Sequence, residues 1–508
     1  MFGYYLSDDE WVLRRHVQMF TDADIDVLFF DVTNGFTYRK SYLVLFHILS
    51  ELLSKGFKVP KVAFYTAPAV RGCGTGNLMD LWEQLYEPRL YSELYFYWKG
   101  KPLIICHSMR SLPDEVRDFF TWRAPTWQAP EQPNTWAWEG NPQRVSVDEN
   151  GNPEEIAVNV CRVAHDKNYD GVGYGLPMSE AAYGVPMMGR SWHDGKKDTR
   201  ENASQYGFLF EEQIEYALKA DPPVAFVCQW NEWLVPFLTE KTNTLYNMTH
   251  WIRLQDEFNE EYSRDIEPMK DGYKDAYYFQ MISFIRRFKG MEKPAADKEY
   301  HTICINDDFS QWENIPFTCR EYTGDTAPRH HRGYDAAGVY VNNTGRNEFS
   351  ICKVASDSEN IYFYAECSEK ISSSDDVNRM MLFLRNPAAS AFSWEGYQFV
   401  INRKKSENGM AYMEACLADG EFLWREILKI ECICIDRKMH IKIPRTALGI
   451  EDGAFSIEFK WSDNMQKADV MDFYLNGDCA PRGRLNYLYI SETSGVSDSD
   501  GERLTSDG

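Results

Sequence analysis

The stretch Val224-Ala-Phe-Val-Cys-Gln-Trp-Asn-Glu-Trp233 decides how this sequence is interpreted, because an unbroken apolar run ends in a carboxylate between two indoles. Such runs are typical of the inner strands of α/β proteins, which are buried on both faces. We therefore expect Glu232 just beyond the C-terminal end of a strand. Active sites of (β/α)8 barrels are assembled at that end, so Glu232 is the first catalytic candidate. A structural glutamate bonded to nearby backbone is the open alternative.

Length and charge limit the class of protein and of partner. A chain of 508 residues is long enough for a barrel and a second domain. The formal net charge of -23 argues against a nucleic-acid or anionic-membrane partner, because both repel an acidic surface. The 15 Trp, 30 Tyr and 30 Phe favour a carbohydrate partner, since an indole offers a flat apolar face with one donor. Nothing in the composition indicates the oligomeric state.

The sequence predicts a soluble chain without cofactors. It has no continuous apolar stretch of about eighteen residues, and Met1-Phe-Gly-Tyr-Tyr-Leu-Ser-Asp-Asp9 lacks the regions of an export signal, so the compartment is left open. The 12 cysteines are scattered, and Cys432 and Cys434 form only a C-x-C pair. We expect neither a metal site nor a disulfide framework.

Helices and strands alternate through the predicted first domain, residues 1–290, and favour a parallel sheet with right-handed crossovers. Over this length we expect a TIM-like (β/α)8 barrel. The chain opens on a helix, so the barrel lacks its first strand; either the sequence is partial or another segment closes the barrel. Predicted helices cover 8–23, 38–55, 78–86, 114–119, 208–220, 251–262 and 275–288, and predicted strands cover 26–31, 62–65, 102–107, 121–123, 156–160 and 224–229.

The pattern changes after a predicted linker at 291–302. Short apolar segments at 360–365, 379–384, 398–402, 438–443 and 455–460 predict an all-β sandwich domain over 303–491. The tail 492–508 is rich in Ser, Asp and Gly, and we expect it to be disordered.

Several motifs resemble those of known carbohydrate-active families. The first domain contains Phe29-Phe-Asp-Val-Thr-Asn34, Gly189-Arg-Ser-Trp-His193, Gln229-Trp-Asn-Glu-Trp233 and Ser263-Arg-Asp-Ile-Glu-Pro268. Through these motifs the segment Tyr4 to Gly290 resembles bacterial proteins related to glycoside hydrolase family 99, the endo-α-mannosidase-like barrels. Around 307–490, Trp394-Glu-Gly-Tyr397, Asn402-Arg403 and Asp472-Phe-Tyr-Leu-Asn-Gly-Asp478 make the second domain similar to family 9 carbohydrate-binding modules. The resemblance implies a glycosidase acting on a glycan or polysaccharide.

Two departures from the family pattern matter. Members of this group have a further strand upstream of Tyr4, in agreement with the missing strand. Family 99 also places a second glutamate three residues after the first, where this chain has Val235. Both departures favour the alternative of a non-catalytic carbohydrate-binding protein derived from a truncated hydrolase.

Hydrolysis of a glycosidic bond usually requires two carboxyl groups, one protonated and one ionised. Burial beside Trp230 and Trp233 is expected to raise the pKa of Glu232 toward that of a general acid. The candidates for the second catalytic carboxylate are Asp31, at a strand end, and Glu139, in a predicted loop, with Asp194 as a further acid. As alternatives to a catalytic role, Asp31 could cap the following turn and Glu139 could lie in a surface loop. The predicted substrate-binding residues are Trp230, Asn231, Trp233, Trp138, His193, Arg190, Asp194, His107 and Tyr65.

Other polar and aromatic groups have competing interpretations. We favour a salt-bridged structural clamp for the acidic and basic residues of Ser263–Pro268. Trp394, Tyr397 and Arg403 suit a sugar platform on the second domain or ordinary strand packing. A polysaccharide lyase is a weaker alternative, in which Arg190 and His193 supply the base and the cationic pocket.

Overall fold

The computed structural model describes residues 1–66, 76–162, 177–184, 187–233, 237–238, 253–254, 256–292, 294–306, 308–373, 376, 378–451 and 453–492. The chain divides into two compact units. Unit 1 contains Met1–Gly3 and Phe20–Met291, and unit 2 contains Tyr4–Met19 and Glu292–Gly508. The segment 4–19, which we expected in the first domain, therefore belongs with the second. Among the described residues, no helix is both long and apolar enough to cross a lipid bilayer.

Unit 1 has an α/β fold in which parallel strands form part of a barrel wall. One sheet has the order β1-β2-β4-β5-β6 and another has the order β11-β8-β7. Strand β6 lies beside β8, where the Asn159 side-chain amide donates to the carbonyl oxygen of Glu139 at 2.6 Å. The parallel strands are β1 (Val27–Val32), β2 (Lys61–Thr66), β4 (Lys101–Ile105), β5 (Thr121–Gln128), β6 (Thr135–Asn141), β8 (Pro153–Asn159) and β11 (Val224–Cys228). The short antiparallel strands are β3 (Tyr97–Trp98), β7 (Ser146–Val147), the pair β9 (Trp192–His193) and β10 (Lys196–Lys197), and the pair β12 (Phe237–Leu238) and β13 (Arg253–Leu254).

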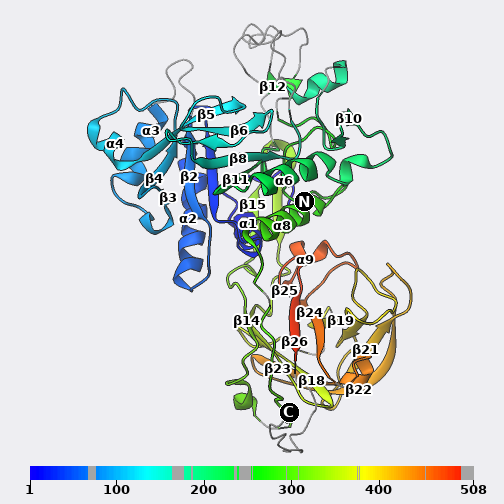
Figure 1. Ribbon diagram of the computed structural model, residues 1–508. Coiled ribbons are helices and arrows are strands. Elements are labelled where there is room, and N and C mark those ends of the chain that lie inside the picture. Colours follow the sequence, from blue (N-terminus) through cyan, green and yellow to red (C-terminus); the bar gives the residue numbers. More distant parts are fainter. Residues whose placement is uncertain are drawn as a thin grey trace, which may run out of the picture. The chain divides into compact units, whose positions relative to one another are not determined.

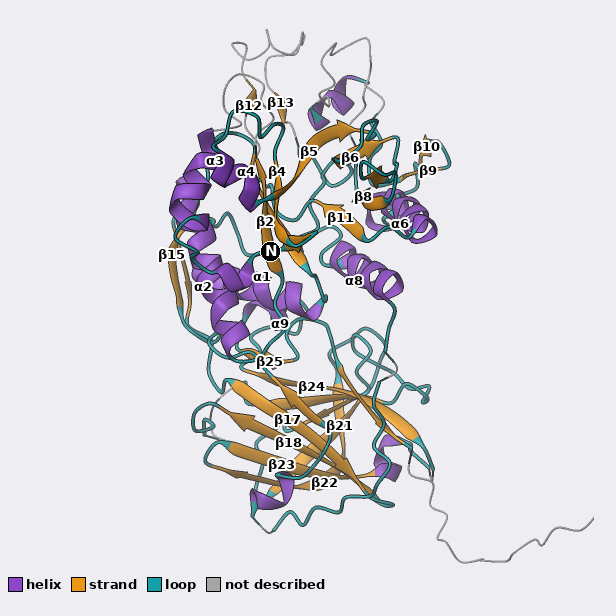
Figure 2. Ribbon diagram, turned by 60° about the vertical axis from the view of Figure 1, so that its left-hand side comes forward, coloured by secondary structure: helices purple, strands orange, loops and turns teal. Residues whose placement is uncertain are grey.

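The helices of unit 1 flank this wall on two sides. Figure 1 and Figure 2 show α2, α3 and α4 on one flank of the strands, and α6 and α8 on the other. Helix α1 contributes residues to both units. The helices are α1 (Glu10–Asp22), α2 (Arg39–Ser54), α3 (Gly76–Leu81), which continues as a π-helical turn at Trp82–Tyr86, α4 (Asp114–Phe119), α6 (Phe208–Ala220) and α8 (Ala276–Lys289).

The inner faces of these strands share one apolar cluster. It contains side chains from β2, β4, β6 and β11, with Phe29 of β1 packed against it. The rings of Phe29 and Phe226 meet edge to face at 5.2 Å, so the two end strands contribute to the same core. Strands β2, β4 and β8 are buried beyond their first residues, whereas β1 and β11 are partly exposed despite their apolar sequences. The wall is therefore open along β1 and β11 within the described ranges.

Two local predictions in unit 1 are wrong. The predicted helix at 251–262 is not formed in its described residues, because 253–254 form strand β13 and 256–262 form bends. The Asn259 side chain accepts from the amides of Glu261 and Tyr262, and this local bonding competes with a helix. The predicted loop around Glu139 is strand β6, in which Trp136 and Trp138 alternate with Ala137 and point into the core.

Unit 2 is a β-sandwich-like fold built from an 11-stranded antiparallel sheet. Strand β22 (Trp424–Ile435) pairs with β21 through its first part and with β23 through Cys432–Ile435, so it passes from one layer to the other. One layer contains β14 (Thr318–Arg320), β17 (Phe349–Ser356), β18 (Asn360–Cys367) and β23 (Lys438–Pro444). The other layer contains β21 (Met410–Cys416), β20 (Phe399–Ile401), β19 (Met381–Arg385), β24 (Phe455–Asp463), β25 (Asp478–Ala480) and β26 (Tyr487–Ser491). Strands β15 (Arg329–Arg332) and β16 (Val339–Asn342) form a separate ribbon, and helix α9 spans Asp472–Leu475.

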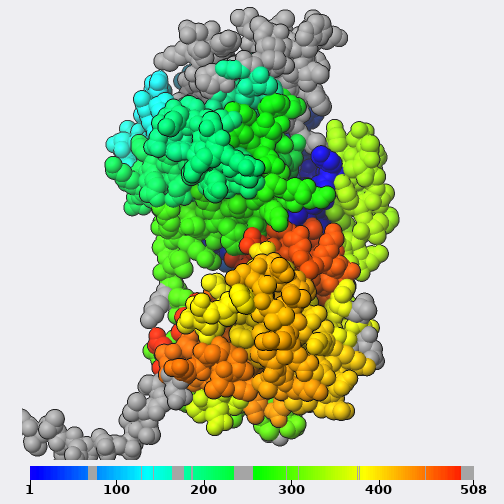
Figure 3. Space-filling model, turned by 90° about the vertical axis from the view of Figure 1, so that its right-hand side faces the viewer, coloured from blue at the N-terminus to red at the C-terminus, as the bar shows by residue number. Residues whose placement is uncertain are grey.

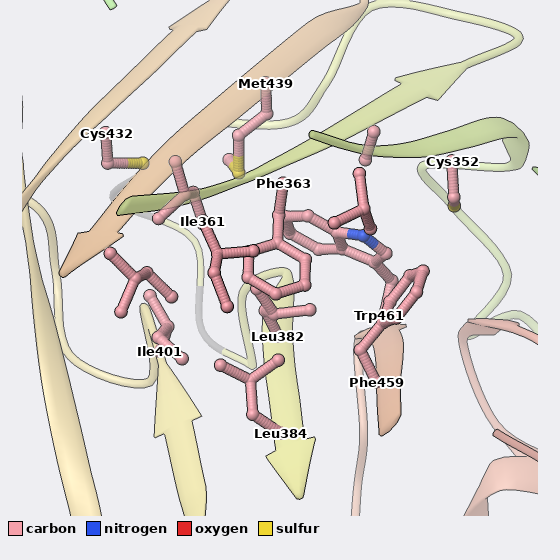
Figure 4. Close-up of a cluster of buried hydrophobic side chains, with 14 of the residues drawn as sticks. Cys352, Ile361, Phe363, Leu382, Leu384, Ile401, Cys432, Met439, Phe459 and Trp461 are labelled. Atoms are coloured by element: carbon pink, nitrogen blue, oxygen red, sulfur yellow. The ribbon is translucent and has the colours of Figure 1, made fainter. Parts of the chain in front are cut away.

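The core of unit 2 lies between these two layers. Phe363 on β18 and Leu382 on β19 belong to this core, as do Phe459 and Trp461 on β24, and Figure 4 shows these side chains turned toward one another. Every second residue of these strands faces this core. The opposite faces of β18 and β19 are also buried, so these strands form apolar runs, and the spacing of such runs made the sandwich predictable from sequence.

A buried charge cluster ties the segment 4–19 into unit 2. Arg482 forms ion pairs with Asp325 and with Asp478, the latter at 2.9 Å. The Gln18 side-chain amide of α1 donates to Asp325 at 2.8 Å, and Arg15 donates to the carbonyl oxygen of Tyr474 at 3.1 Å. These side chains are almost fully buried, so their charges depend on one another for compensation.

Replacing Asp325 by alanine is expected to destabilise unit 2 by about 3–5 kcal/mol, because Arg482 would lose one of its buried carboxylate partners. Urea unfolding measures the loss. The exposed Glu369→Ala substitution is the control and should leave the unfolding midpoint unchanged. An Asp325→Ala midpoint equal to that of the wild type would show that the cluster does not support the fold.

Candidate functional site

The C-terminal ends of the parallel strands bring several predicted site residues to one level. Asp31 on β1 pairs in register with Tyr65 on β2, and Tyr65 pairs with Ile105 on β4. Tyr65 packs edge to face on Trp138 of β6 at 4.5 Å, inside the shared core. Side chains at paired positions of parallel strands share a face, so Asp31 lies on the core side of β1. Asp31 is exposed to solvent, at the open end of this core.

Glu232 lies on the segment that follows β11 and is held there by residues 264–267. The amide of Gln229 donates to the carbonyl oxygen of Arg264 at 3.1 Å, and the amide of Glu267 donates to that of Trp230 at 2.9 Å. The amide of Glu232 itself donates to Oδ1 of Asp265 at 2.6 Å. Two motifs that are distant in the sequence, Gln229–Trp233 and Ser263–Pro268, therefore lie side by side.

Burial and like charges act together on the acids of this site. Desolvation, followed by the charges of Asp31 and Asp265, raises the pKa of Glu232 to about 8, although the Gln229 side-chain amide donates to its carboxyl group. Burial raises the pKa of Asp265 to about 7. Desolvation also raises the pKa of Asp31, against the Thr33 amide that donates to it at 2.8 Å. The charges of Asp31 and Asp265 thus both act on the protonation of Glu232.

The basic residues near these acids have other partners. Arg264 is buried in ion pairs with Glu139 and Asp256. Arg190 is fully buried, with its guanidinium 4.0 Å from the ring centre of Tyr277, and donates to the main-chain oxygen of Asp265 at 2.5 Å. Both arginines are therefore buried residues that stabilise the site and do not face solvent. Arg190 is therefore not accessible to form the cationic pocket that the lyase alternative requires.

Glu139 does not occupy the position we expected. Its side chain is 1% exposed and pairs with Arg264 across the interior. A carboxylate in a buried ion pair has no access to a glycosidic bond, so Glu139 is a structural partner of Arg264 in this arrangement. This ion pair also fits the clamp that we favoured for the segment around Arg264.

The Gly189–His193 motif leads into a hairpin away from these acids. Asp194 and Gly195 both have positive φ and form the two-residue turn between β9 and β10, a position that favours Asp-Gly. The two ring nitrogens of His193 lie 3.0 Å from Asp194 and 3.2 Å from Asp198. Residues near position 200, coloured teal to green, form an outer face of unit 1 in Figure 3. His193 and Asp194 are therefore members of a surface hairpin.

The predicted aromatic residues divide between packing and the site. Trp138 is 7% exposed in the core, and Trp230 packs edge to face on Phe20 at 4.7 Å. Trp233 is partly exposed, and its ring nitrogen donates to Glu267 at 2.6 Å. Asn231 is exposed next to Glu232. Of these four residues, Asn231 and Trp233 are the ones placed to meet a ligand.

The remaining predicted residues have clear positions. Tyr65 is buried, and burial raises its pKa well above the usual value, so it stays a neutral phenol. His107 is exposed, two residues beyond the end of β4. Val235, where family 99 has its second glutamate, lies outside the described residues. Within the described ranges, no group of three or more His, Cys, Asp or Glu residues has an arrangement that would hold a metal ion.

The aromatic residues suggested for a sugar platform on unit 2 are part of its core. Trp394 and Tyr397 are 3% and 2% exposed and pack around Phe383 and Phe473. Arg403 forms a two-pronged ion pair with the buried Glu414. These contacts are those of strand packing, the second of the two interpretations that the sequence allowed.

Sequence reasoning missed Asp265 as a member of the site. It follows Arg264 in a motif that we assigned to a salt-bridged clamp. The available signal was the charged composition of Ser263–Pro268, but the register of this segment against Trp230 and Glu232 is visible only in three dimensions.

A comparison with protein-family models and with curated protein sequences found no match to this chain. The function of this protein is therefore inferred from the geometry of its described residues.

The raised pKa of Glu232 predicts a specific pH dependence of stability. Between the ordinary value of 4.5 and the folded value of about 8, the folded protein keeps a proton that the unfolded chain has lost. Stability of unit 1 should therefore fall as the pH rises through this window, and Glu232→Gln should reduce the slope. Urea unfolding at a series of pH values measures the slope. The exposed Glu115→Gln variant is the control, and equal slopes in both variants would refute the raised pKa.

Proposed function

We propose that the protein is a glycoside hydrolase that acts on a glycan or polysaccharide at the C-terminal end of the parallel strands of unit 1. Glu232 is the general acid and Asp31 is the opposing ionised carboxylate. The observation that carries this proposal is the unequal environment of the two acids. Glu232 is partly buried, and desolvation together with the charges of Asp31 and Asp265 raises its pKa to about 8. Asp31 is more exposed and accepts a main-chain hydrogen bond that opposes the desolvation raising its own pKa. Pairs of acids held in opposite protonation states are the usual catalysts of glycoside hydrolysis.

The fold that we propose for unit 1 is a (β/α)8-type barrel that lacks one strand. Three features support this proposal. Strands β1, β2, β4, β6 and β11 contribute to one interior cluster, β1 and β11 are the end strands of their sheets, and both end strands are partly exposed. Among the described strands, none pairs with the free edge of β1 or of β11, and the strand that a closed barrel needs would lie between these two edges. In barrels of this class, active sites lie at the C-terminal ends of the strands, where Asp31 and Glu232 lie here.

The chemistry follows from these positions. A protonated Glu232 donates its proton to the leaving oxygen of the glycosidic bond, while Asp31 stabilises positive charge on the sugar or activates water from the other side. Trp233, fixed by Glu267, offers a partly exposed indole to a sugar ring. Nothing in this mechanism needs a cofactor, and the acidic site suits a neutral rather than an acidic sugar because the nearby arginines are already paired.

A second candidate is a non-catalytic carbohydrate-binding protein. It is favoured by the unpaired edges of β1 and β11 among the described strands, because an incomplete barrel would lack the side chains that a further strand brings to the site. The two candidates differ in turnover by the wild-type protein. Release of reducing ends from a panel of neutral polysaccharides supports the hydrolase, and binding to the same panel without release supports the second candidate.

Glu232→Gln should lower kcat by about 10²–10⁴-fold on any substrate that the wild type cleaves, because the amide cannot donate the proton. Binding of the substrate, measured by calorimetry, should be retained. Asp31→Asn should also lower kcat strongly. The matched control is Glu115→Gln on α4, which should behave as the wild type. Turnover by Glu232→Gln at the wild-type rate would rule out the proposed mechanism.

The pH profile of the wild-type enzyme should have an alkaline limb near pH 8. Glu232 must be protonated to act as an acid, and its pKa is about 8. The value of kcat/KM should therefore fall as the pH rises through about 8, and it should fall at low pH as Asp31 becomes protonated. An alkaline limb that is unchanged when Asp31 or Glu232 is replaced by its amide would argue that other groups control the profile.

A further inference from the structure

Asp265 is fixed on both sides by hydrogen bonds that pass through the interior of unit 1. Its Oδ1 accepts the amide proton of Glu232 at 2.6 Å, and its main-chain oxygen accepts from Arg190 at 2.5 Å. Arg190 also donates to Ser263 Oγ at 3.3 Å and lies against the ring of Tyr277. Asp265 is 0% exposed, so its carboxyl group has a defined position directly behind Glu232.

The charges of Arg190 and Arg264 act on this carboxyl group, but neither arginine forms an ion pair with it among the described contacts. Its Oδ2 has no hydrogen-bond partner among the described residues. The contact from Arg190 goes to the main-chain oxygen of Asp265, and the guanidinium of Arg264 is paired with Glu139 and Asp256. A negative charge on Asp265 is therefore felt by the nearest acid, Glu232, whose amide it holds.

We propose that Asp265 is a positioning residue for Glu232: its carboxylate holds the main chain of the proton donor and places a negative charge directly behind the Glu232 carboxyl group. The proposal depends on the proposed role of Glu232 as the general acid and assigns a function to a residue that the mechanism above does not use. Arg190 belongs to the same arrangement, because it fixes Asp265 from the opposite side.

Among the described residues, the charged and titratable groups around Glu232 and Asp265 come from several elements. The ones that face either acid are Asp31 on β1, Cys228 on β11, and Arg190, Glu257, Arg264 and Glu267. Burial raises the pKa of both acids, but the charges of Arg190 and Arg264 oppose this rise at Asp265, whereas the charges of Asp31 and Asp265 add to it at Glu232. Two like charges, those of Asp31 and Asp265, therefore oppose the ionisation of Glu232.

The test is a direct titration of Glu232 that needs no substrate. In protein labelled with ¹³C at the glutamate carboxyl carbons, the Glu232 signal is assigned by its loss in Glu232→Gln. Asp265→Asn keeps an oxygen that accepts the Glu232 amide but removes the charge, and should lower the Glu232 pKa by about one unit or more. Asp118→Asn, on the exposed face of α4, removes the same charge elsewhere and should leave the titration unchanged.

Amide exchange of Glu232 tests the second part of the role. Its amide should be protected in the wild type and in Asp265→Asn, and should lose protection in Asp265→Ala, which has no acceptor at this position. A Glu232 pKa that is equal in the wild type and in Asp265→Asn overturns the proposal. If Asp265→Asn does not fold, the wild-type titration decides: a Glu232 signal that titrates near the ordinary value of about 4.3 also overturns it.

The outcome separates this proposal from the proposed function. Loss of turnover in Glu232→Gln tests catalysis, whereas the carboxyl titration tests the effect of Asp265 on Glu232 in the protein without substrate. A Glu232 that responds to Asp265 in a protein without hydrolase activity would support the inference and contradict the proposed function.

Discussion

The hydrogen-bonded junction between residues 229–232 and 264–267 is the constraint on which the site of unit 1 depends. It places a buried aspartate directly against the main chain of a glutamate that reaches the open end of the strands. Burial alone would make both acids weak, and their proximity to Asp31 makes Glu232 weaker still. The arginines of this region hold the junction together through Glu139, Asp256 and the main chain, and so leave the three acids without a direct ion pair among these contacts.

Much of the first unit could be predicted from the sequence, because its elements are long and strongly patterned. Strand β11 is an apolar run, α6 spans 208–220 as predicted, and α4 spans 114–119 as predicted. The predicted helix at 251–262 failed because its apolar spacing is compatible with a helix, while the side chain of Asn259 stabilises a turn. Strand β6 was overlooked because prolines before it suggested a loop, although Trp136-Ala-Trp138 has the alternation of a strand.

Site residues could be predicted from the sequence only where their position at the end of a strand determines where the side chain lies. Asp31 and Glu232 follow apolar runs, and both lie at the strand ends as their positions implied. The roles of Glu139 and Asp265 depend on partners more than thirty residues away in the sequence, which are Arg264 for Glu139 and Glu232 for Asp265. A local sequence pattern does not contain such partners. The same limit applies to unit 2, where Trp394 and Tyr397 have equal β propensity on either face and their burial is set by Phe383 and Phe473.

A double-mutant cycle on Asp31 and Glu232 tests most directly whether these two acids share one site. The free energy of unfolding of unit 1 is measured for the wild type, Asp31→Asn, Glu232→Gln and the double variant, at a pH above the Glu232 pKa of about 8. Both acids are then ionised, so each substitution relieves the same repulsion, and the double variant should differ from the sum of the single effects by more than about 0.5 kcal/mol. Additive effects would show that the two carboxyl groups do not face each other, and would contradict the account.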